Sequence, residues 1–302
     1  MQHRVARIAP TLVVGALCAA ACVTNPYTGK SQLLLLSESQ ETQMGVSGYA
    51  EVSSSSSINT DLDLNEPLRR VGRNIAAVAD AWRRAEGLAP YEWEFKVIAD
   101  DATVNAWCMP GGKIAFYTGI YPILEDENAM AVVMGHEVSH ALLRHGNERV
   151  SQNLITQLGL TAADAVNLGG KHKDLALAAL GTGAQLGVLL PFSREHETDA
   201  DRLGLEIAAR AGYDPRAAVG LWERMAASGG GRPPEFLSTH PDPANRIANM
   251  QRWMPEMLQL WERSQKQQNR RLPDALGRGG TKPKKAATDT QQVAPTRGRA
   301  RR

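Results

Sequence analysis

The chain has 302 residues, 43% of them hydrophobic and only 5% aromatic, which allows one sizeable core and favours a helix-rich protein over an all-β one. Its three cysteines exclude a disulfide framework. The net charge of +2 conceals an acidic body and a basic end, since eleven Lys and Arg face two Asp from Lys266 onward. Such a charge run is typical of a solvated tail, so we predict a disordered segment over 266–302 and no nucleic-acid partner.

The first 21 residues have the pattern of a targeting segment. Arg4 and Arg7 precede an apolar run that is short for a bilayer span and ends in small residues before Cys22. Such an ending resembles a bacterial lipoprotein signal, with Ala19 in place of the usual leucine. This predicts a signal peptide over 1–21, lipid attachment at Cys22 and a periplasmic protein anchored to the outer membrane.

Hydrophobic periodicity predicts a mostly helical body with one small sheet. Turn residues at 25–30 precede an apolar segment, 33–36, and a helix that begins at Ser37 and ends in the polar run 53–57. Further helices are predicted over 68–85, 128–147, 154–190 (one or two), 195–211, 216–227 and 244–260, and strands over 91–98 and 114–117. The fold class is therefore α+β, predominantly helical, with the main domain over 22–265.

The chemistry is concentrated in His136-Glu137-Val138-Ser139-His140. Histidines four residues apart share one face of a helix, where both imidazoles reach one ion. Glu137 is displaced by one residue and is placed to take a proton from a zinc-bound water. The flanking residues are mostly apolar, so we expect a buried helix, in which such a cluster without a partner would be costly. This predicts one catalytic Zn²⁺ per chain and hydrolysis of peptide bonds.

A catalytic zinc needs a third protein ligand. His145 follows His136 by nine residues and lies about half a turn out of phase on an ideal helix, so we expect it to face away. The metzincin pattern needs Gly and His where this chain has Leu143 and Gly146. That class is therefore excluded.

A better source of the third ligand lies between residues 193 and 201. Glu197 and Asp201 are four apart on a predicted helix, so one can bind the metal while the other holds a ligand imidazole. Spacing alone leaves Glu195 and His196 open as alternatives.

Four ordered motifs resemble those of one family of zinc peptidases. They are Asn105-Ala106-Trp107 with Pro110-Gly111-Gly112; His136 to His140; Ser193-Arg194 through Glu197 to Asp201; and Thr239-His240-Pro241 with Arg246. The chain is similar to the HtpX and CAAX prenyl endopeptidase family of membrane-associated zinc peptidases from about Cys22 to Met254. It most resembles the bacterial periplasmic lipoprotein branch.

The resemblance implies a gluzincin-type domain with defined residue roles. The implied zinc ligands are His136, His140 and Glu197. Glu137 would be the general base and then the acid, and Asp201 would hydrogen-bond a ligand histidine, expected to be His136.

The resemblance also implies roles around the open coordination position. His240 would be a second catalytic group that steadies the oxyanion, or would occupy the open position in a resting state. Arg246 would orient substrate or His240, the alternative being a structural ion pair. Cys108 is expected to be a packed thiol rather than a fourth ligand.

The expected substrate site is an edge strand formed by Lys113 to Tyr117 above the metal. An extended peptide would add to this strand through main-chain hydrogen bonds. The residues assigned to substrate binding are Asn105, Lys113, Ile114, Ala115 and Arg246.

The resemblance implies that the substrates are misfolded or misassembled cell-envelope proteins and that envelope assembly machinery supplies partners. Three rivals are a chaperone with a structural zinc, a cell-wall amidase, and a peptidase for prenylated or lipid substrates. The intact Glu137 argues against the chaperone, because a structural zinc site needs no general base.

Overall fold

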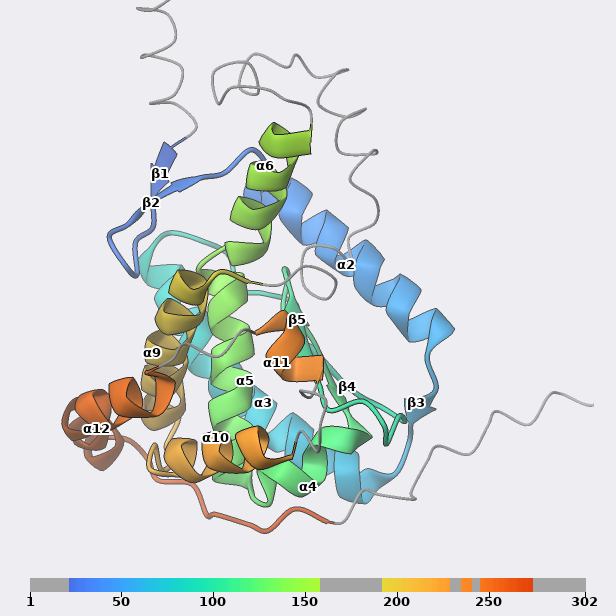
Figure 1. Cartoon of the computed structure of the whole chain (residues 1–302), viewed down its shortest axis with the longest axis vertical. Helices are drawn as coiled ribbons and strands as arrows, with labels where there is room; N and C mark the ends of the chain where they lie inside the picture. The colour runs from blue at the N-terminus through green and yellow to red at the C-terminus, as the bar shows by residue number, and fades with distance from the viewer. Residues whose placement is uncertain (1–21, 158–191, 229–234, 241–244, 274–302) are drawn as a thin grey trace, which may run out of the picture.

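The computed structural model describes residues 22–157, 192–228, 235–240 and 245–273 (Figure 1). Its helices are α2 (Glu38–Ser55), α3 (Leu62–Ala85), α4 (Tyr121–Leu124), α5 (Glu127–Leu142), α6 (His145–Gln157), α9 (Arg194–Arg210), α10 (Ala217–Ala227), α11 (Glu235–Thr239) and α12 (Arg246–Arg263), with a 3-10 turn at Thr118–Ile120. Its strands are β1 (Cys22–Thr24), β2 (Ser31–Leu33), β3 (Ile58–Asn59), β4 (Glu94–Ile98), β5 (Ala106–Met109) and β6 (Lys113–Tyr117). The predicted α+β, predominantly helical class is confirmed.

Several predictions lie outside the described residues. They are the signal peptide, the part of the helices predicted over 154–190 that lies beyond residue 157, and the part of the predicted tail from residue 274 onward. Within the described ranges, no helix has the length and apolar character needed to cross a bilayer.

Helix α5 lies at the centre of the molecule, with α9, α3 and the sheet around it (Figure 1). Its N-cap is Asp126, whose carboxylate accepts a hydrogen bond from the backbone N–H of Ala129 at 2.9 Å. Every residue of α5 is buried. A helix without a polar face belongs in a core, so its charged motif is removed from bulk water.

Helices α5 and α9 approach each other closely at two glycines. A Cβ on Gly135 would lie 2.4 Å from the carbonyl oxygen of Gly204, and a Cβ on Gly204 would lie 2.5 Å from the backbone nitrogen of His136. Only glycine permits this contact. It holds α9, and with it Glu197, against the helix that carries His136.

The four-stranded sheet has the order β3-β4-β6-β5. β6 pairs in parallel with β4 and antiparallel with β5, so both of its edges are used. The prediction that Lys113 to Tyr117 forms the edge strand is therefore wrong. β5 ends the sheet, because the tight turn at Gly111 and Gly112 (φ 86° and 80°) folds it back along β6.

The single helix predicted over 128–147 is divided in two. α5 ends at Leu142, Arg144 has φ 57°, and α6 begins at His145. The Arg144 guanidinium donates to the Glu41 carboxylate at 2.8 Å and to the carbonyl of Leu36 at 2.9 Å. These bonds hold a backbone conformation that is uncommon outside glycine.

The N-terminal part of the body packs against this helix break. Ser37 forms a capping box with Gln40 at the start of α2. The helix ends at Ser55, inside the polar run predicted to end it, and the hydroxyls of Ser54 and Ser55 bond back to the carbonyl of Glu51. Strands β1 and β2 form a hairpin.

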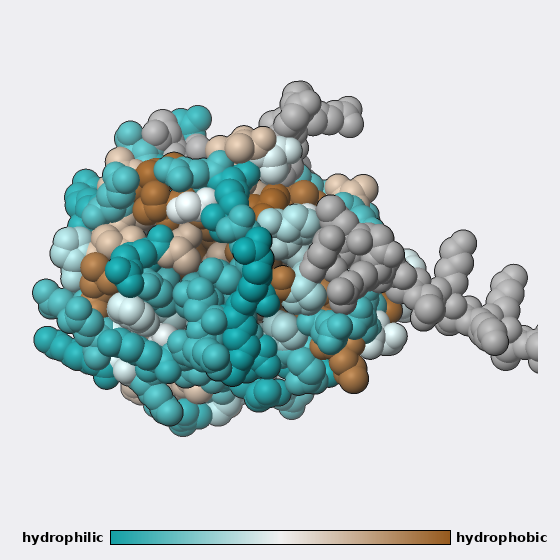
Figure 2. All heavy atoms as spheres, turned by 90° about the horizontal axis from the view of Figure 1, so that it is seen from below, coloured by the Kyte–Doolittle hydropathy of each residue, from teal (hydrophilic) through white to brown (hydrophobic). Residues whose placement is uncertain are grey.

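The body continues past the predicted boundary at Gln265. The backbone N–H of Gln267 donates to the carbonyl of Gly212, and that of Leu272, which is buried, donates to the carbonyl of Glu125. This segment crosses the lower end of the molecule in Figure 1, and the same end, seen from below in Figure 2, is mostly hydrophilic.

Candidate metal centre

The two histidines of the motif, His136 and His140, direct their ring nitrogens toward each other. Their spacing on α5 puts Nε2 of His136 3.1 Å from Nε2 of His140. Both side chains are buried. Two ring nitrogens at this distance either share a proton or face a common cation.

Helix α9 delivers the carboxylate. Its N-cap is Ser193, whose hydroxyl accepts from the backbone N–H of His196 at 3.1 Å. One oxygen of Glu197, which is fully buried, lies 3.4 Å from Nε2 of His140, and the other lies 3.4 Å from Nε2 of His136.

The two alternatives to Glu197 point elsewhere. Glu195 is exposed and pairs with Lys30 at 2.8 Å. His196 places its Nε2 3.1 Å from the Glu148 carboxylate. Of the three acidic and histidine candidates, the geometry brings Glu197 to the two histidines.

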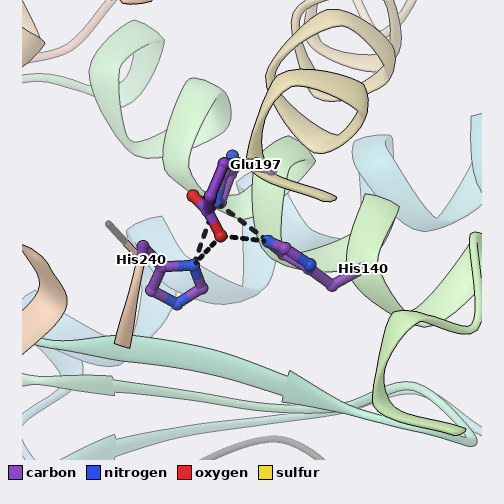
Figure 3. A group of neighbouring side chains, drawn as sticks. His140, Glu197 and His240 are labelled. Carbon is purple, nitrogen blue, oxygen red and sulfur yellow. Dashed lines mark hydrogen bonds and ion pairs between the residues drawn. The ribbon is translucent and has the colours of Figure 1, made fainter. Parts of the chain in front are cut away.

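His240, which follows α11, completes the cluster. Its Nδ1 lies 3.2 Å from Nε2 of His136 and 3.1 Å from the Glu197 carboxylate. Figure 3 shows the side chains of His140, Glu197 and His240 converging. The His240 ring stacks on Phe236 with centroids 4.5 Å apart, which holds it over the cluster.

The four groups are close enough to share one zinc ion. One ligand atom from each of the four side chains lies within 4.8 Å of the others. The separations quoted above, which involve both oxygens of Glu197, run from 3.1 to 3.4 Å. Three imidazoles and one carboxylate are also the ligand types that zinc takes.

Asp201 and Arg246 support the cluster from behind. Oδ1 of Asp201 lies 2.9 Å from Nδ1 of His136, as expected for a carboxylate that orients a ligand imidazole. Arg246 donates to the Glu197 carboxylate at 2.6 Å and to Asp201 at 2.7 Å. Its side chain is only 1% exposed. These contacts match the alternative of a structural ion pair, and a role of Arg246 in substrate binding stays a prediction.

Burial and charge set the protonation of the metal-free cluster. Burial alone would lower the pKa of His136, but Glu197 and Asp201 raise it to about 10. Burial would raise the pKa of Glu197, but His240 and His136 hold it well below its usual range. Burial lowers the pKa of His140. His136 thus carries the proton that a metal ion would displace.

Glu137 lies beside the cluster rather than in it. Its carboxylate oxygen is 3.6 Å from Nε2 of His240, and burial raises its pKa. Cys108 is also buried and its thiol is directed at the carbonyl of Met109, outside the donor group. The expectation of a packed thiol fits these contacts.

The other residues assigned to substrate binding are buried in the sheet. Asn105 accepts from the backbone N–H of Ala106, and Lys113 donates to the carbonyl of Glu92 at 2.6 Å and to Glu94 at 2.7 Å. Ile114 and Ala115 are at most 1% exposed. All four side chains are buried, at 3% exposure or less.

His145 contributes no atom to the donor group, as expected, but its ring does not turn away from α5. Its Nδ1 lies 3.0 Å from Nδ1 of His140. The helix break at Arg144 turns His145 back toward α5. The sequence carries no glycine at that position to signal a break.

Comparison with known proteins agrees with this geometry. Residues 65–254 match the family profile described as peptidase family M48. The mitochondrial metalloendopeptidase OMA1 of Schizosaccharomyces pombe is 37% identical over 190 residues, which cover 62% of this chain and 52% of the relative. The β-barrel assembly-enhancing protease of Escherichia coli K12 is 28% identical over 259 residues, 82% of this chain and 51% of the relative. The chain spans about half the length of the curated relatives it matches.

The predicted bacterial periplasmic, outer-membrane location is contradicted by these relatives. The mitochondrial metalloendopeptidases reach 39% identity, as in Arabidopsis thaliana, above the 28% of the E. coli proteases. The prediction depended on residues 1–22, and a basic, apolar leader is a pattern that several compartments share.

Proposed function

Because the chain belongs to peptidase family M48, we propose that it is a zinc-dependent metalloendopeptidase that hydrolyses peptide bonds within proteins. One observation carries the proposal: four buried side chains each offer one ligand atom within 4.8 Å of the others, with the Glu137 carboxylate beside them. A general base next to an acidic metal ion is the arrangement that hydrolysis needs.

Each residue in and beside the donor cluster has one role in this proposal. His136, His140 and Glu197 would hold the ion, and Asp201 would orient the His136 ring. Bound zinc would supply Lewis acidity that polarises the scissile carbonyl and acidifies a water. Glu137 accepts a proton from the attacking water and returns it to the leaving amine. Its raised pKa suits both transfers.

An extended substrate would pair with the outer edge of β5, where the described part of the chain places no further strand. The strand ends the sheet and packs on α5. Main-chain pairing at this edge gives affinity with little dependence on substrate sequence. A non-cleavable peptide should then slow hydrogen exchange of the amides in 106–109, and unchanged exchange there would exclude this mode.

His240 would occupy the fourth coordination position in the resting enzyme, and cleavage would require it to leave. Its Nδ1 is as close to the other donors as they are to one another. His240→Ala should keep zinc and cleave casein faster than the wild type. A loss of about 10²–10³-fold would instead assign His240 to oxyanion stabilisation, as predicted from the resemblance.

The substrates would be misfolded or misassembled proteins, with assembly machinery as a partner. The support is the name of one relative, a β-barrel assembly-enhancing protease. Lipid attachment at Cys22, which is exposed at the start of β1, also stays a proposal. Fatty-acid labelling that persists in Cys22→Ser would exclude it.

The decisive experiment combines metal analysis with protein digestion. We expect the purified full chain to contain zinc and to cleave casein at internal bonds. Removal of zinc by a chelator should stop cleavage, and added Zn²⁺ should restore it. A folded sample that binds no zinc would refute the proposal. A sample that binds zinc but does not cleave casein would favour a chaperone with a structural zinc. Release of peptidoglycan fragments would favour a cell-wall amidase.

A further inference from the structure

The two ring nitrogens of His140 face different partners. Nε2 belongs to the donor cluster, 3.1 Å from Nε2 of His136 and 3.4 Å from Glu197. Nδ1 faces Nδ1 of His145 at 3.0 Å. Both rings are buried, at 3% and 1% exposure.

Metal binding decides which nitrogen carries the proton. A neutral imidazole that binds an ion through Nε2 keeps its proton on Nδ1. The Nδ1–H of His140 then needs an acceptor, and Nδ1 of His145 is the atom within hydrogen-bond distance. The Nδ1 of the other motif histidine, His136, faces a carboxylate instead, because Oδ1 of Asp201 lies 2.9 Å from it in an ion-pair contact.

We propose that His145 is a positioning residue for the metal ligand His140. Its Nδ1 accepts the hydrogen bond from His140, fixes the tautomer with a free Nε2 and sets the direction of that ring. The proposal rests on the proposed zinc peptidase function and extends it to a residue outside the donor cluster.

The His145 ring is itself held in place by packing. It stacks on His196, with centroids 4.2 Å apart and planes at 16°. His196 places its Nε2 3.1 Å from the carboxylate of Glu148, which also accepts from Gln32 at 2.8 Å. The support of His140 thus reaches the hairpin of β1 and β2, far from α5 in the sequence.

Three substitutions separate hydrogen bonding from packing. His145→Asn puts an amide oxygen near the place of Nδ1, since both atoms are bonded to Cγ. His145→Gln moves the same amide one methylene further, and His145→Leu removes the acceptor. In the full-length chain we would measure Zn²⁺ affinity by competition with a chromophoric chelator and the visible spectrum of the Co²⁺ form. Thermal unfolding of the metal-free proteins would report on packing.

We expect His145→Leu and His145→Gln to lose about 10–100-fold in zinc affinity, the range typical for partners of metal ligands. His145→Asn should stay close to the wild type in affinity and in its Co²⁺ spectrum. Equal losses of affinity in His145→Asn and His145→Gln, or wild-type affinity in His145→Leu or His145→Gln, would overturn the proposal. If His145→Leu fails to fold, the comparison of zinc affinity between His145→Asn and His145→Gln decides. A wild type without zinc would instead refute the proposed function.

Discussion

We expect Glu137→Gln to lower the rate of casein cleavage by about 10²–10⁴-fold while its zinc content equals that of the wild type. The amide has the shape of the carboxylate but cannot accept a proton from water. Glu137 lies outside the four-residue donor group, so the ion should be retained. Metal analysis and peptide release from the same preparation measure both quantities.

A matched control is Glu127→Gln, the same change on the same buried helix. Glu127 pairs with Arg70 and lies outside the donor group. This variant should be less stable than the wild type yet cleave at the wild-type rate per folded molecule. Undiminished cleavage by Glu137→Gln would show that another group activates the water.

Arg246→Met should destabilise the metal-free protein by about 3–5 kcal/mol, the usual cost of removing one partner from a buried ion pair. The guanidinium bonds both Glu197 and Asp201 and lies 3.8 Å from the centroid of the Trp222 ring. Methionine leaves two buried carboxylates without their cation. Zinc neutralises part of that charge, so the loss should be smaller in the zinc-loaded protein. Urea unfolding with and without chelator tests both statements.

Arg202→Met serves as the comparison. Arg202 pairs with Glu256 at 3.2 Å on the surface, where both side chains are about half exposed. Such a pair contributes about 0–1 kcal/mol. If the two variants lose equal stability, or if zinc does not reduce the loss in Arg246→Met, Arg246 is not the counter-ion of the site.

The motifs were predictable because their geometry is local. Two histidines four apart on a helix must share a face, whatever the rest of the fold. Most helix positions also followed from the sequence, since apolar periodicity decides which face a helix buries. The ends were less predictable: the single helix predicted over 128–147 ends at Leu142, because the backbone at Arg144 breaks it.

The sequence by itself determined the His-Glu-His helix, the acidic helix that supplies Glu197 and the α+β class. Only the tertiary structure decided which strand lies at the edge of the sheet, that Arg246 pairs with buried carboxylates of the site, and that His145 turns back to His140. The physical reason is the distance along the sequence between the residues that interact. Spacing along a helix fixes neighbours three and four residues apart, whereas these three outcomes depend on strand pairing, a buried ion pair and a backbone break held by Glu41, a residue 103 positions from Arg144.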